Sequence, residues 1–191
     1  MALLPGCAAP RLGIVRELAR EKYIILDRGQ AIGSEEFVLT TTPKWGREIQ
    51  STITHSGVNI QINTIIQIAP DWSARNVTIS SSPGKLRAAW DGDRGPAFGD
   101  SVAFLLVWLR TNPLEAGSRK TQRVLYYDSV ARELRERTFV IDRVPDRGRR
   151  LCYRFRFDLG AWWELETDHR DLPLLLRSGS TEISREDIIP N

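Results

Sequence analysis

One stretch of the sequence decides the fold: Val58-Asn59-Ile60-Gln61-Ile62-Asn63-Thr64-Ile65-Ile66-Gln67-Ile68. Its even positions are apolar apart from Thr64, and its odd positions are amides apart from Ile65. Because successive side chains of a strand point to opposite faces, the stretch predicts a β-strand with one apolar and one amide-rich face. A helix would scatter the isoleucines around its circumference, and β-branched residues are stiff in helices. At about 3.3 Å per residue, the strand would span roughly 35 Å.

A second clean alternation runs from Leu151 to Asp158, with Leu151, Tyr153, Phe155 and Phe157 on one face. Further strand-like runs are separated by turn residues, and they cover 23–26, 35–42, 47–55, 72–80, 85–90, 121–127, 133–143 and 161–167. Strands of this number and length twist and coil rather than stay flat. The sequence therefore predicts a mostly β protein, in which a strongly bent antiparallel sheet forms a half-barrel or barrel with one or two short helices.

Three segments are less regular. Residues 10–22 match a short amphipathic helix, which could lie on a membrane surface, form a lid or, as we favour, plug one end of the barrel. Residues 101–110 lack alternation and fit a strand buried on both faces or a core helix, and we favour the strand. Residues 172–176 suggest a short closing helix. We expect a tail with a short helix over 1–22, one β-rich domain over 23–177 and a polar tail over 178–191.

Composition limits the class of protein. The 191 residues are 41% hydrophobic and 27% charged, as expected for an ordinary globular domain. The two cysteines, Cys7 and Cys152, show no zinc spacing and are read as free thiols of a reducing, cytoplasmic compartment. Cys7 would be a lipid-attachment site only if the chain had a different start. The longest apolar run, Val102 to Leu109, is far shorter than the ~18 residues of a spanning helix, so no stable membrane insertion is expected.

Charge argues against nucleic acid as a partner. The net charge is only +3. A local basic patch lies at Arg143, Arg147, Arg149, Arg150, Arg154 and Arg156, but the nearby aromatic residues occupy the opposite strand face. Single-stranded nucleic acid requires aromatic and basic side chains on the same face.

Tryptophan is abundant, with six residues in the chain. Indole rings suit the mouth of a cavity that meets an amphiphile, since they are apolar with one polar tip. The alternative is that they fill the ends of the barrel as core. Five of them lie beside turns or at strand ends: Trp45, Trp72, Trp90, Trp162 and Trp163.

Few residues suggest catalysis. His55 shares the parity of Ile53 and should face inward near a strand end, as a general base or as a hydrogen-bonded core histidine. Glu35 or Glu36 could be its partner. Glu164 and Glu166 share a strand face. They could act as a general acid and base, or they could simply be solvated. No spacing supports a metal site, no glycine-rich phosphate loop occurs, and no cofactor is expected.

Three passages resemble a bacterial glycolipid-binding family, a domain of unknown function named for its fold. They are 33–39, 68–77, and 90–100 together with 111–114, and the resemblance covers about 33–176. The resemblance implies a curved antiparallel sheet around a long groove, similar to carriers that shield lipids. It also implies five positions of interest, namely Glu35, Trp72, Arg75, Trp90 and Asn112.

These observations lead to three functional hypotheses. The first is non-enzymatic binding of a lipid-like or glycolipid-like amphiphile, with Arg75, Glu35 and the tryptophans orienting its polar end. The second is a hydrolase or isomerase acting on an apolar small molecule in the same cavity, with His55 as general base. The third is an interaction module whose sheet edge pairs with a partner or with a second copy to form a homodimer.

Overall fold

The computed structural model describes residues 15–44, 46–57, 60–82, 86–91, 96–128 and 133–188, and for 86–91 and 97 the backbone alone. In chain order the elements are β1 (Arg16–Asp27), β2 (Gln30–Thr42), β3 (Gly46–His55), β4 (Ile60–Ile68), β5 (Ala74–Ser82), β6 (Leu86–Asp91), β7 (Ala97–Phe98), α1 (Ala103–Thr111), β8 (Arg119–Asp128), β9 (Glu133–Arg147), β10 (Arg150–Phe157), β11 (Trp163–Thr167), β12 (Pro173–Ser178), β13 (Thr181–Arg185) and the 3-10 helix η2 (Glu186–Ile188).

All thirteen described strands belong to one sheet, in the order β6-β5-β4-β3-β2-β1-β13-β12-β11-β10-β9-β8-β7. Neighbouring strands are antiparallel, except that β7 pairs with β8 in parallel. The sheet is not closed, but its edge strands β6 and β7 are separated by only five residues of sequence, a chain that reaches about 20 Å when extended. The two edges therefore approach each other, and the predicted bent antiparallel sheet with a short helix is confirmed.

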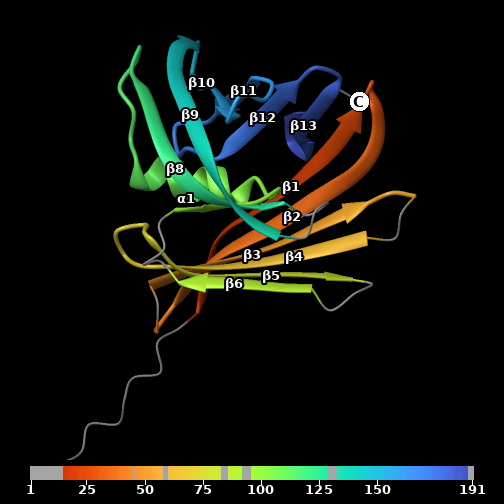
Figure 1. Cartoon of the computed structure of the whole chain (residues 1–191), viewed down its shortest axis with the longest axis vertical. Helices are drawn as coiled ribbons and strands as arrows, with labels where there is room; N and C mark the ends of the chain where they lie inside the picture. The colour runs from red at the N-terminus through yellow and green to blue at the C-terminus, as the bar shows by residue number, and fades with distance from the viewer. Residues whose placement is uncertain are drawn as a thin grey trace, which may run out of the picture.

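Register shifts accompany the bend. β1 and β2 change register between Ile25 and Leu26, and β4 and β5 change between Gln67 and Ile68. Such bulges bend a strand and increase its twist. Figure 1 shows the result, with β3 to β6 on one side, β8 to β12 on the other, and β1 and β2 crossing between them.

The inner face of the sheet follows the predicted alternation, except that Ile60 of β4 is exposed and Cys152 of β10 is buried. In β4, Ile62, Ile66 and Ile68 are buried, whereas Gln61 and Ile65 are not. In β10, Tyr153 and Phe155 are buried and Arg154 is exposed. Val58 and Asn59, the first residues of the central stretch, lie outside the described residues.

Helix α1 lies inside the bend, between the two sides of the sheet (Figure 1). The preference for a strand at 101–110 is wrong, because Ala103 to Thr111 are helical. All residues from Ala103 to Leu109 are buried, so the helix is apolar on every side and has no polar face to reveal its period. None of the described helices is long and apolar enough to cross a membrane.

Three further expectations are wrong for the described residues. Residues 16–22, expected in a helix, belong to β1 and pair with β2. Residues 173–178 form β12 rather than a closing helix, and 181–185, assigned to a polar tail, form β13. The physical reason is tertiary pairing, since β13 lies between β1 and β12 and satisfies the backbone hydrogen bonds of both.

Candidate functional site

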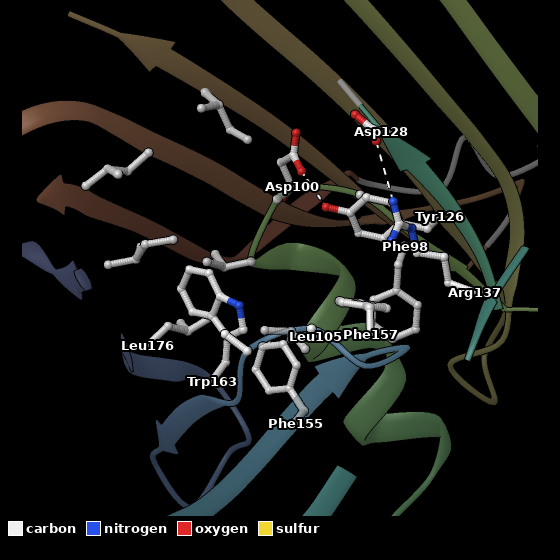
Figure 2. Close-up of a pocket in the computed structure, with 18 of the residues that line it drawn as sticks. Phe98, Asp100, Leu105, Tyr126, Asp128, Arg137, Phe155, Phe157, Trp163 and Leu176 are labelled. Carbon is white, nitrogen blue, oxygen red and sulfur yellow. Dashed lines mark hydrogen bonds and ion pairs between the residues drawn. The ribbon is translucent and has the colours of Figure 1, made fainter. Parts of the chain in front are cut away.

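A cavity of about 580 Å³ opens on the concave side of the sheet. Strands β1, β3, β8 to β13 and helix α1 all contribute side chains to it, and one side of its wall is apolar. Strand alternation points these residues inward, and Phe155 of β10 stacks on Trp163 of β11 with ring centroids 6.3 Å apart. The apolar side includes Leu105, Phe155, Trp163 and Leu176 (Figure 2).

The other side of the cavity carries two polar pairs. Tyr126 donates its hydroxyl to Asp100 Oδ1 at 2.7 Å, and Arg137 Nη2 lies 3.5 Å from Asp128 Oδ2. Burial, together with the Asp100 carboxylate, raises the pKa of Tyr126, so the phenol stays protonated as a donor. In Figure 2 these four residues lie together, opposite Trp163 and Leu176. The cavity is thus apolar at one side and hydrogen-bonding at the other.

Arg137 is held in place by a turn residue. Asp158, which follows β10 with φ of 50°, accepts the backbone N–H of Thr138 at 2.8 Å and pairs with Arg137 Nη1 at 3.2 Å. The guanidinium carbon also lies 5.3 Å from the centre of the Tyr126 ring. Asp128 and Asp158 therefore both pair with the Arg137 guanidinium, and the Asp100 carboxylate accepts the hydroxyl of the neighbouring Tyr126.

His55 lines this cavity, as its parity predicted. It is the last residue of β3 and is half-buried, opposite Gly33 of β2 and Ile60 of β4. A Cβ at Gly33 would lie 2.5 Å from the carbonyl oxygen of Thr54, so glycine allows β2 and β3 to approach here.

Glu35 lies elsewhere, fully buried beneath the start of α1 and not among the residues that line the His55 cavity. Its Oε1 accepts hydrogen bonds from Ser51 at 2.7 Å and Ser101 at 2.5 Å, and its Oε2 accepts the backbone N–H of Val102 at 3.0 Å. Burial raises the pKa of this carboxyl, against the hydrogen bonds, which lower it. Glu35 of β2 therefore anchors the start of helix α1.

Trp72 and Asn112 lie at the other end of α1. Asn112 lines a second cavity of about 220 Å³, on the opposite flank of the helix. The carbonyl oxygen of Trp72 accepts a hydrogen bond from Thr111 at 3.0 Å, and its ring lies between the guanidiniums of Arg47 and Arg110, at 4.6 and 5.1 Å. Neither residue lines the larger cavity.

The remaining positions lie apart from both cavities or outside the description. Arg75 is exposed on β5. Trp90 pairs through its backbone with Val77, and its side chain is outside the described residues, as is all of Trp45. Among the described residues, no cluster of three or more His, Cys, Asp or Glu could hold a metal ion.

The basic patch is largely ion-paired. Arg147 and Arg150 both contact Glu166, at 3.1 and 2.6 Å, and Arg154 pairs with Asp142 at 2.7 Å. Carboxylates on the same face thus neutralise much of the patch. This includes Glu166, one of the two carboxylates considered for acid–base work.

Sequence reasoning missed the polar side of the cavity. One signal was present, because Arg137 shares the parity of Phe139 and Ile141, and an arginine on the apolar face of a strand is unusual. Tyr126 and Asp128 likewise share one face of β8. Asp100 gave no signal, since it lies in the segment before α1 and meets Tyr126 only in the folded chain.

No protein-family model and no curated protein matches the chain. A solved structure of a DUF1089 family protein from Pseudomonas aeruginosa is similar, with 16% identity, a TM-score of 0.50, and coverage of 91% of this chain and 95% of that one. A β-barrel-like protein of the domain of unknown function DUF1849 from Brucella abortus aligns with 8% identity, a TM-score of 0.42, and coverage of 87% and 93%. The first likeness shows a shared fold with a domain of unknown function, and the sequence resemblance agrees at that level.

Proposed function

We propose that the protein binds a lipid-like amphiphile with a neutral, hydroxyl-bearing head group, as in a glycolipid. The apolar tail occupies the side of the larger cavity formed by residues such as Leu105, Trp163 and Leu176. The head group lies against the Asp100–Tyr126 and Asp128–Arg137 pairs. The observation that carries the proposal is this division of one 580 Å³ cavity into an apolar and a hydrogen-bonding side.

Apolar burial supplies the affinity in this proposal, at about 0.8 kcal/mol for each methylene removed from water. The polar side supplies selectivity for the head group. Its carboxylates accept hydrogen bonds from hydroxyl groups, and Arg137 donates them. An anionic head group would meet the Asp100 and Asp128 carboxylates in the cavity wall and would be disfavoured.

Native mass spectrometry of the protein as purified from its expression host tests the proposal. We expect a bound mass of several hundred daltons that is lost on denaturation and that fragments to an aliphatic chain and a neutral head. Refolded, ligand-free protein should then take up a single-chain alkyl glucoside but not the alkyl phosphate of equal chain length. Uptake of neither compound would contradict the proposal.

A second candidate is acid–base catalysis on an apolar small molecule in the same cavity. The observation that favours it is the position of His55 in the cavity wall. Replacement His55→Gln should then abolish turnover of the substrate and leave the melting temperature unchanged. A fall in melting temperature would instead indicate that His55 has a structural role.

A further inference from the structure

We propose that the cavity accepts one aliphatic chain and that Leu105 of α1 sets the longest chain that fits. This inference rests on the proposed function and deepens it, because it names the class of amphiphile. In this proposal, the side chain of Leu105 blocks the end of the aliphatic tail. The reasons are the volume of the cavity, the position of α1, and the way in which α1 is fixed.

The volume of the cavity favours a ligand with one chain. If each non-hydrogen atom takes about 30 Å³, the share of one water molecule in the liquid, a cavity of about 580 Å³ has room for roughly 20 atoms. That is enough for one chain of about a dozen carbons with the first atoms of a head group, and a second chain of equal length would need the same space again. The cavity therefore suits a single-chain amphiphile.

Helix α1 forms part of the wall of the cavity. Val102 and Leu105, three residues apart and so on one face of the helix, line it. Phe104, Val107 and Trp108 instead line the second cavity of about 220 Å³. The helix thus divides the space inside the bent sheet into two chambers, and Figure 2 shows Leu105 between Phe155, Trp163 and the polar side.

The helix is tied at both ends, so a tail cannot readily displace it. At its start, the backbone N–H of Val102 is bound by Glu35. At its end, Thr111 binds the carbonyl oxygen of Trp72, and Arg110 Nε lies 3.3 Å from Asp171 Oδ2. A fixed partition of this kind stops a tail at a defined depth, which a mobile lid would not do.

Leu105 is the residue that can change this depth without disturbing the anchors. Its side chain lines the cavity and is 5% exposed, whereas Val102 beside it belongs to the Glu35 contact. Replacement Leu105→Ala removes three carbon atoms from the wall and opens space for about the same number of methylenes. Leu109, on the same helix, is 3% exposed and lines neither cavity, so Leu109→Ala is a matched control.

The experiment measures the Kd of n-alkyl glucosides with 6 to 16 carbons, each below its critical micelle concentration, by calorimetry on ligand-free protein. For the wild type we expect affinity to rise about fourfold per methylene and to level off near a dozen carbons. Leu105→Ala should move this plateau to chains two or three carbons longer, and Leu109→Ala should leave it in place. Leu105→Phe adds volume to the cavity wall and should move the plateau to shorter chains. This variant still tests the proposal if Leu105→Ala does not fold.

The outcomes separate the two proposals. An unmoved plateau in both Leu105 variants overturns the role of Leu105, and equal affinity for a dialkyl glucoside overturns the limit to one chain. In both cases amphiphile binding itself would stand. If no single-chain glucoside binds the wild type, the proposed function fails and this inference fails with it.

Discussion

Glu35 and Val102, 67 positions apart in the chain, are joined by a hydrogen bond of 3.0 Å from the backbone N–H of Val102 to Glu35 Oε2. The bond ties β2 to the start of α1 in the buried interior. The first N–H groups of a helix lack partners within it, and Val102 itself makes no side-chain cap. The carboxyl group of Glu35, from a distant strand, therefore caps the helix together with Ser101 Oγ, which accepts the backbone N–H of Ala103 at 3.1 Å.

Replacement Glu35→Ala should strongly lower the free energy of unfolding. It leaves the N–H of Val102 and the hydroxyls of Ser51 and Ser101 buried without their shared acceptor, and we expect a loss of about 3 kcal/mol. Urea denaturation measures the change. The control is Glu36→Ala, which removes an exposed ion pair with Arg20 and should cost less than about 1 kcal/mol. Equal losses in both variants would contradict the anchoring role.

The same carboxyl should make stability depend on pH. Burial raises the pKa of Glu35 in the folded protein above its ordinary value of 4.5, so the folded state holds the proton to higher pH than the unfolded chain does. Its contribution is fully present below pH 4.5 and is lost as pH rises through the folded pKa. Relative to Glu35→Gln, the wild type should lose stability as pH rises above 4.5, and parallel curves from urea denaturation would refute this.

The strand faces were predictable from sequence, and the interior was not. In β4 and β10 the alternation of apolar and polar residues predicts which side chains are buried. Ile62, Ile66 and Phe155 are buried, as this alternation predicts. Helix α1 has no polar face, so its apolar run fits a strand equally well. β13 pairs with β1, at the other end of the chain, and β12 completes the sheet between β11 and β13, so a local pattern does not show that these residues form strands.

The candidate site was predictable only in part, for a related reason. His55 was placed in the cavity by alternation within one strand. The Asp100–Tyr126 and Asp128–Arg137 pairs depend on the register of β8 with β9 and on the segment before α1. Such contacts between elements carry no periodic signal in the sequence.

Replacement Arg137→Gln should weaken binding of a neutral alkyl glucoside. It removes the guanidinium that pairs with Asp128 and Asp158, a charge-assisted donor worth about 1.5–3 kcal/mol, which corresponds to roughly a tenfold to hundredfold rise in Kd. Calorimetric titration measures the change. The control is Arg123→Gln on β8, because the Arg123 side chain is 85% exposed and lies away from the cavity. Equal Kd values for the two variants would rule out a role of Arg137 in binding the head group.

Variants of Trp72 test whether this residue carries backbone strain or contacts the ligand. Its φ of 70° is in the left-handed region, which costs a side-chain-bearing residue about 1–2 kcal/mol, and its ring lies between Arg47 and Arg110. Trp72→Ala loses the ring and keeps the strain, whereas Trp72→Gly loses the ring and relieves the strain. We therefore expect both to be less stable than the wild type, with the glycine variant about 1 kcal/mol more stable than the alanine variant by urea denaturation.

Neither Trp72 variant should change the Kd of an alkyl glucoside, because Trp72 does not line the larger cavity. Affinity is best measured at a temperature where both variants remain folded, so that lost stability is not mistaken for lost binding. The first hypothesis drawn from the sequence, in which the tryptophans orient the polar end of the ligand, implies the opposite result, a ligand-contacting tryptophan whose removal weakens binding and spares the fold. A weaker Kd at wild-type stability would move the ligand from the larger cavity toward the C-terminal end of α1, where Asn112 lines the second cavity.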